Sequence, residues 1–242
     1  MLAIFKREFK SYFQNVIGWL FVAALLAVYG LYFYVYNLKN GYPYISYDLK
    51  GIGFIMMIAV PILTMRSLSD EKKTKTDQLM LTSPVSVGKI VAGKYFAMAA
   101  VYTIDIAFFA LSPLVLSIYG KVALSEAYVA LFGYWLYGLS CIAVGLFISS
   151  ISESVIISAI LTFAALFLSY MMQSITGLIS SSGNLLTKVL NCFDLYTPFE
   201  NFVSGCFSVT SAAYYVTVIL LLCFLTTQSI QKGDVSYCKS AL

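Results

Sequence analysis

Two acidic residues are the main candidates for chemistry, because the sequence offers few alternatives. Histidine is absent, which removes the commonest metal ligand and the commonest general base. The five cysteines contain no C-x-x-C pair, so the sequence predicts neither a zinc site nor a redox motif. No serine or cysteine has a visible base. We therefore expect no catalytic residue, no metal ligand and no cofactor bound by this chain, and an enzyme is the weakest hypothesis.

The stretch from Gly88 to Tyr95 comes close to a phosphate-binding loop. It fits G-x-x-x-x-G-K, but Tyr95 stands where the motif needs Ser or Thr. That hydroxyl would coordinate Mg²⁺, and a strand should precede the loop. The stretch lies instead at the mouth of an apolar segment, so we expect no nucleotide site here.

Asp105 and Glu200 are the two candidate acids. Asp105 lies near the middle of an apolar segment, where a carboxylate costs roughly 2.5–3.5 kcal/mol if the segment is in lipid. It either hydrogen-bonds Tyr, Ser or Thr on a neighbouring helix, or it serves a wet cavity as a cargo contact or proton site. Glu200 ends the string Thr197-Pro198-Phe199-Glu200, which has capping-box spacing and favours a helix cap over a cargo contact.

The composition places these residues in a membrane protein. Of 242 residues, 60% are hydrophobic and only 11% are charged, with a mean hydropathy of +0.86. A soluble domain is about a quarter charged, so lipid is the natural solvent for this chain. We expect an all-α integral membrane protein that forms a single domain over 1–242. Its six transmembrane helices are expected at about 16–36, 48–66, 95–119, 128–148, 155–172 and 212–230.

Three further segments complete this layout. Residues 1–15 have an apolar face and a basic face, as an interfacial helix lying on lipid headgroups would have. The loop over 67–94 is the one strongly charged stretch. The long loop over 173–211 is expected to form two short helices, at 184–193 and from Thr197. It holds Cys192 and Cys206, which could form a disulfide or stay free.

Basic residues indicate the orientation. Eleven of the 15 Lys and Arg residues fall at the N-terminus, at Arg66 and in the loop over 67–94 that follows it, and in the tail, all on one side of a six-span layout. Lys39, Lys50, Lys121 and Lys188 fall on the other side. Positive charge marks the cytoplasm, so both termini are expected there. This clustering is a topology signal and does not predict nucleic-acid binding.

The charged loop is the segment best suited to a partner. Ser69-Asp70-Glu71 has a capping side chain and then acids, as at a helix start. Thr76 to Leu81 has the pattern of a short amphipathic helix, which Thr82-Ser83-Pro84 would end. The pattern alone fits a solvated loop and a docking helix about equally well.

The string from Arg66 to Lys94 resembles the corresponding loop of ABC transporter permeases of the type-2 exporter class, including gliding-motility and multidrug-export-like members. The matching residues are Arg66, Glu71, Lys72, Lys73, Thr76, Leu79, Leu81, Ser83, Pro84, Val85, Ser86 and Lys94. The N-terminal stretch Lys6 to Phe13 is also similar to that family's opening. Many members continue with Ser-Pro, where this chain has Gln14-Asn15, so the bend into the first span is left open.

The resemblance implies a permease subunit that moves cargo using ATP hydrolysed by a separate protein. It implies two copies of an ATPase subunit that bind ATP and Mg²⁺, a second permease subunit (the same or different), and contact with membrane lipid. It assigns coupling to the ATPase to Arg66, Glu71, Thr76, Asp77, Leu79, Leu81 and Pro84. It also implies that the two short helices of 173–211 dip into the outer leaflet. The alternative is an ATP-independent transporter or channel with Asp105 as its ion or proton site, although no inverted repeat is evident.

Overall fold

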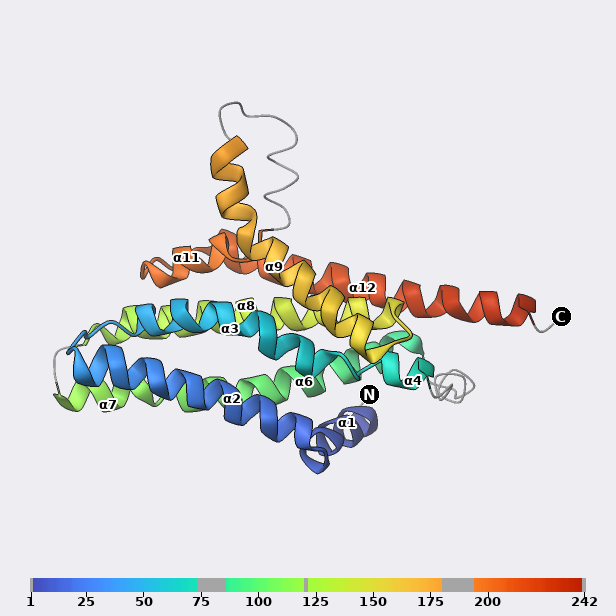
Figure 1. Ribbon diagram of the computed structural model, residues 1–242, viewed down its shortest axis with the longest axis horizontal. Coiled ribbons are helices and arrows are strands. Elements are labelled where there is room, and N and C mark those ends of the chain that lie inside the picture. The colour runs from blue at the N-terminus through green and yellow to red at the C-terminus, as the bar shows by residue number, and fades with distance from the viewer. Residues whose placement is uncertain (1, 74–85, 120–121, 180–193, 241–242) are drawn as a thin grey trace.

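The chain forms a bundle of long helices. The computed structural model describes residues 2–73, 86–119, 122–179 and 194–240, with the backbone alone for 173–179 and 232–240, and these ranges contain helices and no strands. The long helices lie roughly along one axis (Figure 1). The predicted all-α class is confirmed.

Six helical segments in the described ranges are long and apolar enough to cross a membrane. They are Val16–Lys39, Ile45–Lys73, Val87–Ile118, Leu124–Ile151, Val155–Met172 and Val209–Gln231. Each has at least 18 residues, close to the roughly 20 that a bilayer requires. The protein is therefore a multi-pass membrane protein, and the prediction of six transmembrane helices is confirmed.

Several of these segments are built from two helices in succession. The first joins α2 (Val16–Tyr32) to a π-helix, η1 (Phe33–Lys39). The second joins α3 (Ile45–Thr64) to the short α4 (Ser69–Lys73) through a turn. The third breaks between α6 (Val87–Phe109) and α7 (Ser112–Tyr119). Pro113, the second residue of α7, has no N–H to continue the ladder from α6, which accounts for a break at this point.

Helix α8 (Leu124–Ile151) is the centre of the bundle. It contacts α3, α6, α9 (Val155–Ile179), α11 (Thr197–Val203) and α12 (Val209–Ser240). Glycines on α8 allow the closest approaches: a Cβ at Gly138 would lie 2.3 Å from the Tyr102 ring, and one at Gly145 would lie 2.3 Å from Thr64 Oγ1. The absence of a side chain at these positions lets α6 and α3 pack directly on the α8 backbone.

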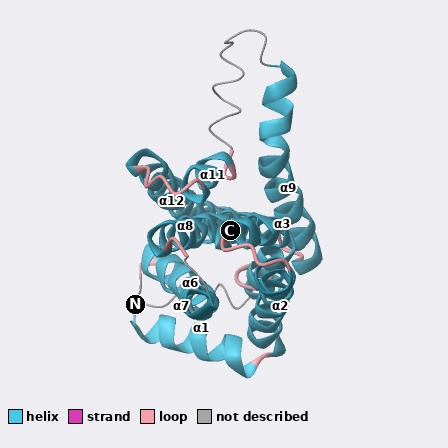
Figure 2. Ribbon diagram, turned by 90° about the vertical axis from the view of Figure 1, so that its left-hand side faces the viewer, coloured by secondary structure: helices cyan, strands magenta, loops and turns pink. Residues whose placement is uncertain are grey.

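The N-terminal helix α1 (Leu2–Gln14) runs across the end of the bundle instead of along it (Figure 2). Its aromatic residues Phe9, Tyr12 and Phe13 pack against the core, whereas Lys6 and Lys10 are exposed. This matches the two faces predicted for an interfacial helix. The chain turns into α2 at Asn15, whose side chain donates to Ser11 Oγ at 3.5 Å.

Two boundaries differ from the sequence prediction. Helix α6 begins at Val87 instead of near residue 95, so the charged loop is shorter and Lys94 lies inside the helix. Of the two short helices expected in 173–211, the second is present as α11, and the segment 184–193 lies outside the described residues. Cys192 lies outside them too, and Cys206 is an exposed free thiol.

Replacing Gly145 by Ala should destabilise the bundle by about 1–3 kcal/mol, the usual cost of overpacking a core. The new methyl would meet Thr64, a buried β-branched residue whose hydroxyl donates to Val60 O at 3.0 Å. The measurement is the thermal midpoint of unfolding in detergent. Gly30→Ala is the control, because no atom lies within 4 Å of a Cβ there. A Gly145→Ala protein as stable as the control would contradict this packing.

Candidate functional site

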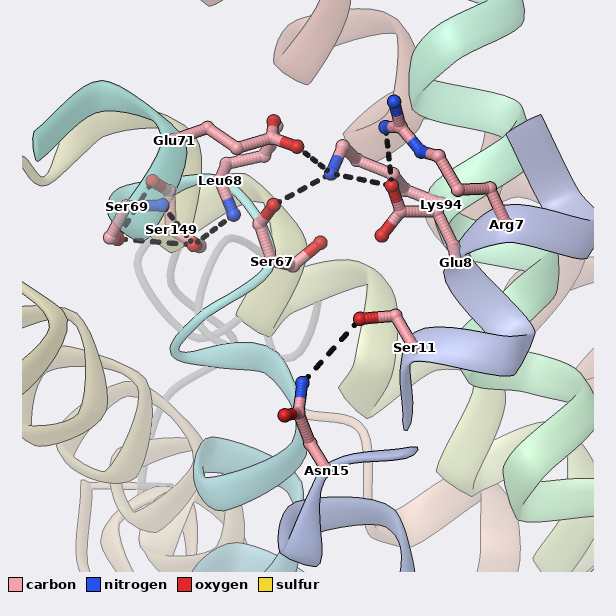
Figure 3. A network of polar contacts seen from close by, with 10 residues as sticks. All are labelled: Arg7, Glu8, Ser11, Asn15, Ser67, Leu68, Ser69, Glu71, Lys94 and Ser149. Atoms are coloured by element: carbon pink, nitrogen blue, oxygen red, sulfur yellow. Dashed lines mark hydrogen bonds and ion pairs between the residues drawn. The ribbon is translucent and has the colours of Figure 1, made fainter. Parts of the chain in front are cut away.

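The strongest polar cluster among the described residues centres on Lys94, and we call it the Lys94 junction. The Lys94 amine donates to Glu71 Oε1 at 2.7 Å and to the Ser67 carbonyl at 2.9 Å, and it lies 3.5 Å from Glu8 Oε1 (Figure 3). Arg7 pairs with the same Glu8 oxygen at 2.7 Å. The junction thus ties together α1, the turn after α3, α4 and α6.

Only 2% of the surface of Lys94 is exposed. Lysine is almost never fully buried unless it is paired, because removing an ammonium from water costs several kcal/mol. Glu8 and Glu71 are only 15% and 22% exposed, so both carboxylates are also held partly out of water. Partial burial and the neighbouring Glu8 carboxylate raise the pKa of the Tyr12 phenol, so Tyr12 adds no charge here. These charges specify how the four segments fit together.

A second set of bonds fastens the same turn to the end of α8. Ser149 Oγ accepts the backbone N–H groups of Leu68 and Ser69, both at 3.1 Å, and Ser69 Oγ lies 3.1 Å from the Ser149 hydroxyl and carbonyl oxygens. Lys72 donates to the Ser150 carbonyl. Helix α4 does begin at Ser69, but that hydroxyl contacts α8 and does not cap α4, so the expected capping role of Ser69 is wrong.

The residues expected to couple to an ATPase divide into two groups. Arg66 is exposed in the turn, and Glu71 is part of the Lys94 junction. Thr76, Asp77, Leu79, Leu81 and Pro84 lie outside the described residues. The chain on either side of that segment, α4 up to Lys73 and α6 from Val87, is held at the junction.

Asp105 lies deep in the bundle on α6. It is 0% exposed, and neither of its carboxylate oxygens has a hydrogen-bond partner among the described residues. The hydroxyl of Tyr134 on α8 is likewise buried without a partner. The expected hydrogen bond from a neighbouring Tyr, Ser or Thr is therefore not seen. A buried polar atom without a partner costs about 1–3 kcal/mol, so Asp105 lowers the stability of the bundle.

Glu200 does not cap α11. The N-cap residue is Tyr196, and no side chain caps the helix there. Asp194 lies just before it: its Oδ1 accepts the N–H groups of Tyr196 and Thr197, each at 3.0 Å, and its Oδ2 accepts the Thr197 hydroxyl at 2.5 Å. The expected capping box is therefore wrong, because Thr197 is not the N-cap. Glu200 instead lies 3.5 Å from the Lys50 amine and lines a cavity of about 560 Å³.

Sequence reasoning missed Lys94, Glu8 and Ser149 as junction residues. Lys94 was expected to be a loop cation, because a lysine at the edge of an apolar run normally reaches water. The near phosphate-loop motif contains the explanation: Gly88 to Lys94 is helical, and Gly93 lets α1 approach, since a Cβ there would lie 3.0 Å from Ile4 Cγ2. A glycine directly before a lysine inside an apolar helix is the signal that could have indicated the junction.

Replacing Lys94 by Met should lower the free energy of unfolding by about 2 kcal/mol, less than the 3–5 kcal/mol for a fully buried pair because the carboxylates retain some water. Thermal and denaturant unfolding in detergent measure this effect. The double variant Lys94→Met with Glu71→Gln should recover part of the loss. Lys89→Met, at an exposed lysine of the same helix, is the control. Additive losses in the double variant would mean that the two residues do not interact.

Replacing Asp105 by Leu should leave the thermal midpoint unchanged or raise it, because no protein hydrogen bond is lost and an apolar group fills the site. Ser149→Ala makes the comparison, since it removes an acceptor used by two backbone N–H groups and should lower the midpoint. If Asp105→Leu were destabilising to the same degree, the carboxyl would have to be satisfied by a bound water or ion.

Comparison with known families agrees with this architecture. The family described as ABC-2 family transporter protein matches residues 5–227, nearly the whole chain. No curated protein matches the chain. The match extends over α1, all six spanning segments and the Lys94 junction. The chain therefore belongs to the ABC-2 transporter family, as a membrane component of a transport system.

Proposed function

We propose that this chain is the permease subunit of an ABC exporter and moves cargo across the cytoplasmic membrane with ATP hydrolysed by a separate subunit. Family membership supports a transport role with an ATPase partner. That partner would bind ATP and Mg²⁺. The chain itself would contribute the membrane path and the contact through which force enters.

The Lys94 junction is the observation that carries this proposal. A partner that pushes on residues 76–81 pulls on α4 at one end of that segment and on α6 at the other. Both helices are bonded to each other through Lys94 and Glu71, to α1 through Glu8, and to α8 through Ser149. A push on a short loop would therefore move four parts of the bundle together instead of bending the loop alone.

The charge distribution supports the orientation that this mechanism needs. The elements at the junction end, α1, the turn before α4, α4 and the start of α6, carry the basic residues Lys6, Arg7, Lys10, Arg66, Lys72, Lys73, Lys89 and Lys94. The end of η1 and the start of α3, which lie at the other end of the bundle (Figure 1), carry Lys39 and Lys50. Because positive charge is retained in the cytoplasm, the junction end faces the cytosol in this proposal. Both termini lie on that side, and α11 lies on the outer side.

The complete transporter would contain a second permease subunit, identical or different, and two ATPase subunits. Cargo would pass between the two permeases. The spans are apolar and carry no feature that selects one class of cargo.

The second candidate function is ATP-independent transport with Asp105 as an ion or proton site. The observation in its favour is the buried carboxyl without a hydrogen-bond partner, since ionisable groups within spans often mark such sites. This function predicts activity of the chain alone in liposomes.

The experiment is purification from native membranes in mild detergent, followed by mass spectrometry of bound proteins and an ATPase assay. A variant with Asp77, Leu79 and Leu81 all changed to Ala should lose the ATPase, because the docking surface is removed while the bundle is untouched. The matched control changes Leu38, Lys39 and Leu124 to Ala, which are exposed at the other end. If the wild-type chain arrives alone and transports in liposomes without ATP, the exporter proposal is wrong and Asp105 is the next residue to change.

A further inference from the structure

A polar cavity lies at the end of the bundle opposite the Lys94 junction, and we call it the outer pocket. It has a volume of about 560 Å³, within the range of small-molecule sites. Its lining comes from the start of α3, the first turn of α8 and α11. These three segments lie at the same end of the bundle (Figure 1). Its lining residues are Tyr44, Ser46, Tyr47, Lys50, Glu126, Glu200, Asn201, Val203 and Ser204.

Charges of both signs face this cavity. Lys50 lies 3.5 Å from Glu200, beyond the 2.7–3.2 Å of roughly ideal N–H···O bonds. Lys50 is 41% exposed and Glu200 is 31% exposed, so both are accessible to a ligand. Glu126 contributes a second carboxylate from α8. One amine and two carboxylates give the pocket a net charge of about −1, so it suits a ligand that carries a cationic group together with an anionic one.

The turn after α11 comes close to Glu126. Gly205 has φ of +77°, in the left-handed region that favours glycine, and a Cβ there would lie 3.0 Å from Glu126 Cγ. The exposed Glu126 side chain therefore lies beside the Gly205 backbone, and a larger residue at position 205 would displace it.

Two tyrosines add a surface for a cation. The rings of Tyr44 and Tyr47 lie 6.4 Å apart at 77°, an edge-to-face pair, and they are 51% and 58% exposed. Tyrosine rings attract ammonium groups. Tyr44 is the N-cap residue of α3 and Tyr47 lies in its first turn, so the segment that carries Lys50 also brings both rings to the cavity.

We infer that the outer pocket binds an ammonium–phosphate zwitterion, with the ammonium on Glu126, Glu200 and the tyrosines and the phosphate on Lys50. A phosphatidylethanolamine headgroup carries this chemistry, and the pocket lies where apolar spans begin, at the level of lipid headgroups. The membrane lipid is therefore the source we assign. This inference does not depend on an ATPase partner.

The test is lipid retention by the full chain. Purified protein is given equal amounts of phosphatidylethanolamine and phosphatidylglycerol with identical acyl chains, and native mass spectrometry counts the lipids that remain bound. The wild type should prefer phosphatidylethanolamine. Lys50→Gln should weaken the retention of both lipids, because both carry the phosphate that Lys50 would bind, and Glu126→Gln should weaken the preference for phosphatidylethanolamine roughly tenfold. Gly205→Ala should weaken it too without changing any charge. Glu153→Gln and Lys39→Gln, at exposed residues outside the pocket, should leave it unchanged.

Competition with soluble O-phosphoethanolamine then distinguishes a membrane lipid from a free zwitterion as the ligand. Displacement of the lipid by this compound would identify a free zwitterion as a ligand, and its failure to compete identifies the lipid; the pocket chemistry stands in both cases. Equal retention of both lipids by the wild type, or loss of preference in the two controls as well, would overturn the inference. Neither result bears on whether an ATPase co-purifies, so this test and that of the proposed function can fail separately.

Discussion

The arrangement of the junction end depends on one buried charge. The Lys94 amine is almost fully removed from water, and it can be there only because Glu71, Glu8 and the Ser67 carbonyl surround it. Each partner comes from a different segment, so the cost of leaving any one of them unpaired is what holds the four segments in register. Apolar packing alone would let helices in lipid slide, because lipid tails solvate them equally well.

Different interactions therefore hold the bundle together in its middle and at its two ends. Its middle is held by close backbone approach at the α8 glycines, with Asp105 as an unsatisfied acid inside it. One end is held by ion pairs around a buried lysine, whereas the other has a more exposed ion pair, exposed tyrosines and an open cavity. A transporter that is driven from one side of a membrane and open on the other would require one tightly held end and one accessible end.

The sequence predicted the parts of the fold that depend on local pattern. Apolar runs of about 20 residues gave the six spans, and the alternation of Phe and Lys gave the two faces of α1. The α11 helix was also predicted, although its N-cap is Tyr196 and not Thr197. The capping-box spacing at Thr197 and Glu200 is a local signal, and Asp194 instead accepts the N–H groups of Tyr196 and Thr197.

The candidate site was only partly predictable, because it is made of long-range contacts. Glu71 was expected to contribute to coupling. No local sequence pattern could show that α1 covers Lys94, or that Ser149 hydrogen-bonds to the turn after α3. The outer pocket joins residues from α3, α8 and α11 and has no sequence signature. These sites depend on which helices contact one another, and the periodicity of each helix does not specify those contacts.

The most direct test of the central claim is a distance measurement across the junction in the complex with the proposed ATPase. Spin labels at the exposed positions Lys10 on α1 and Lys73 on α4 would be followed by double electron–electron resonance, without nucleotide and in an ATP-trapped state. The account predicts one narrow distance distribution in both states, because the two helices move as one unit, and a broadened distribution in the Lys94→Met variant. Separation of the labels upon ATP binding in the wild type, or identical distributions in wild type and variant, would contradict it.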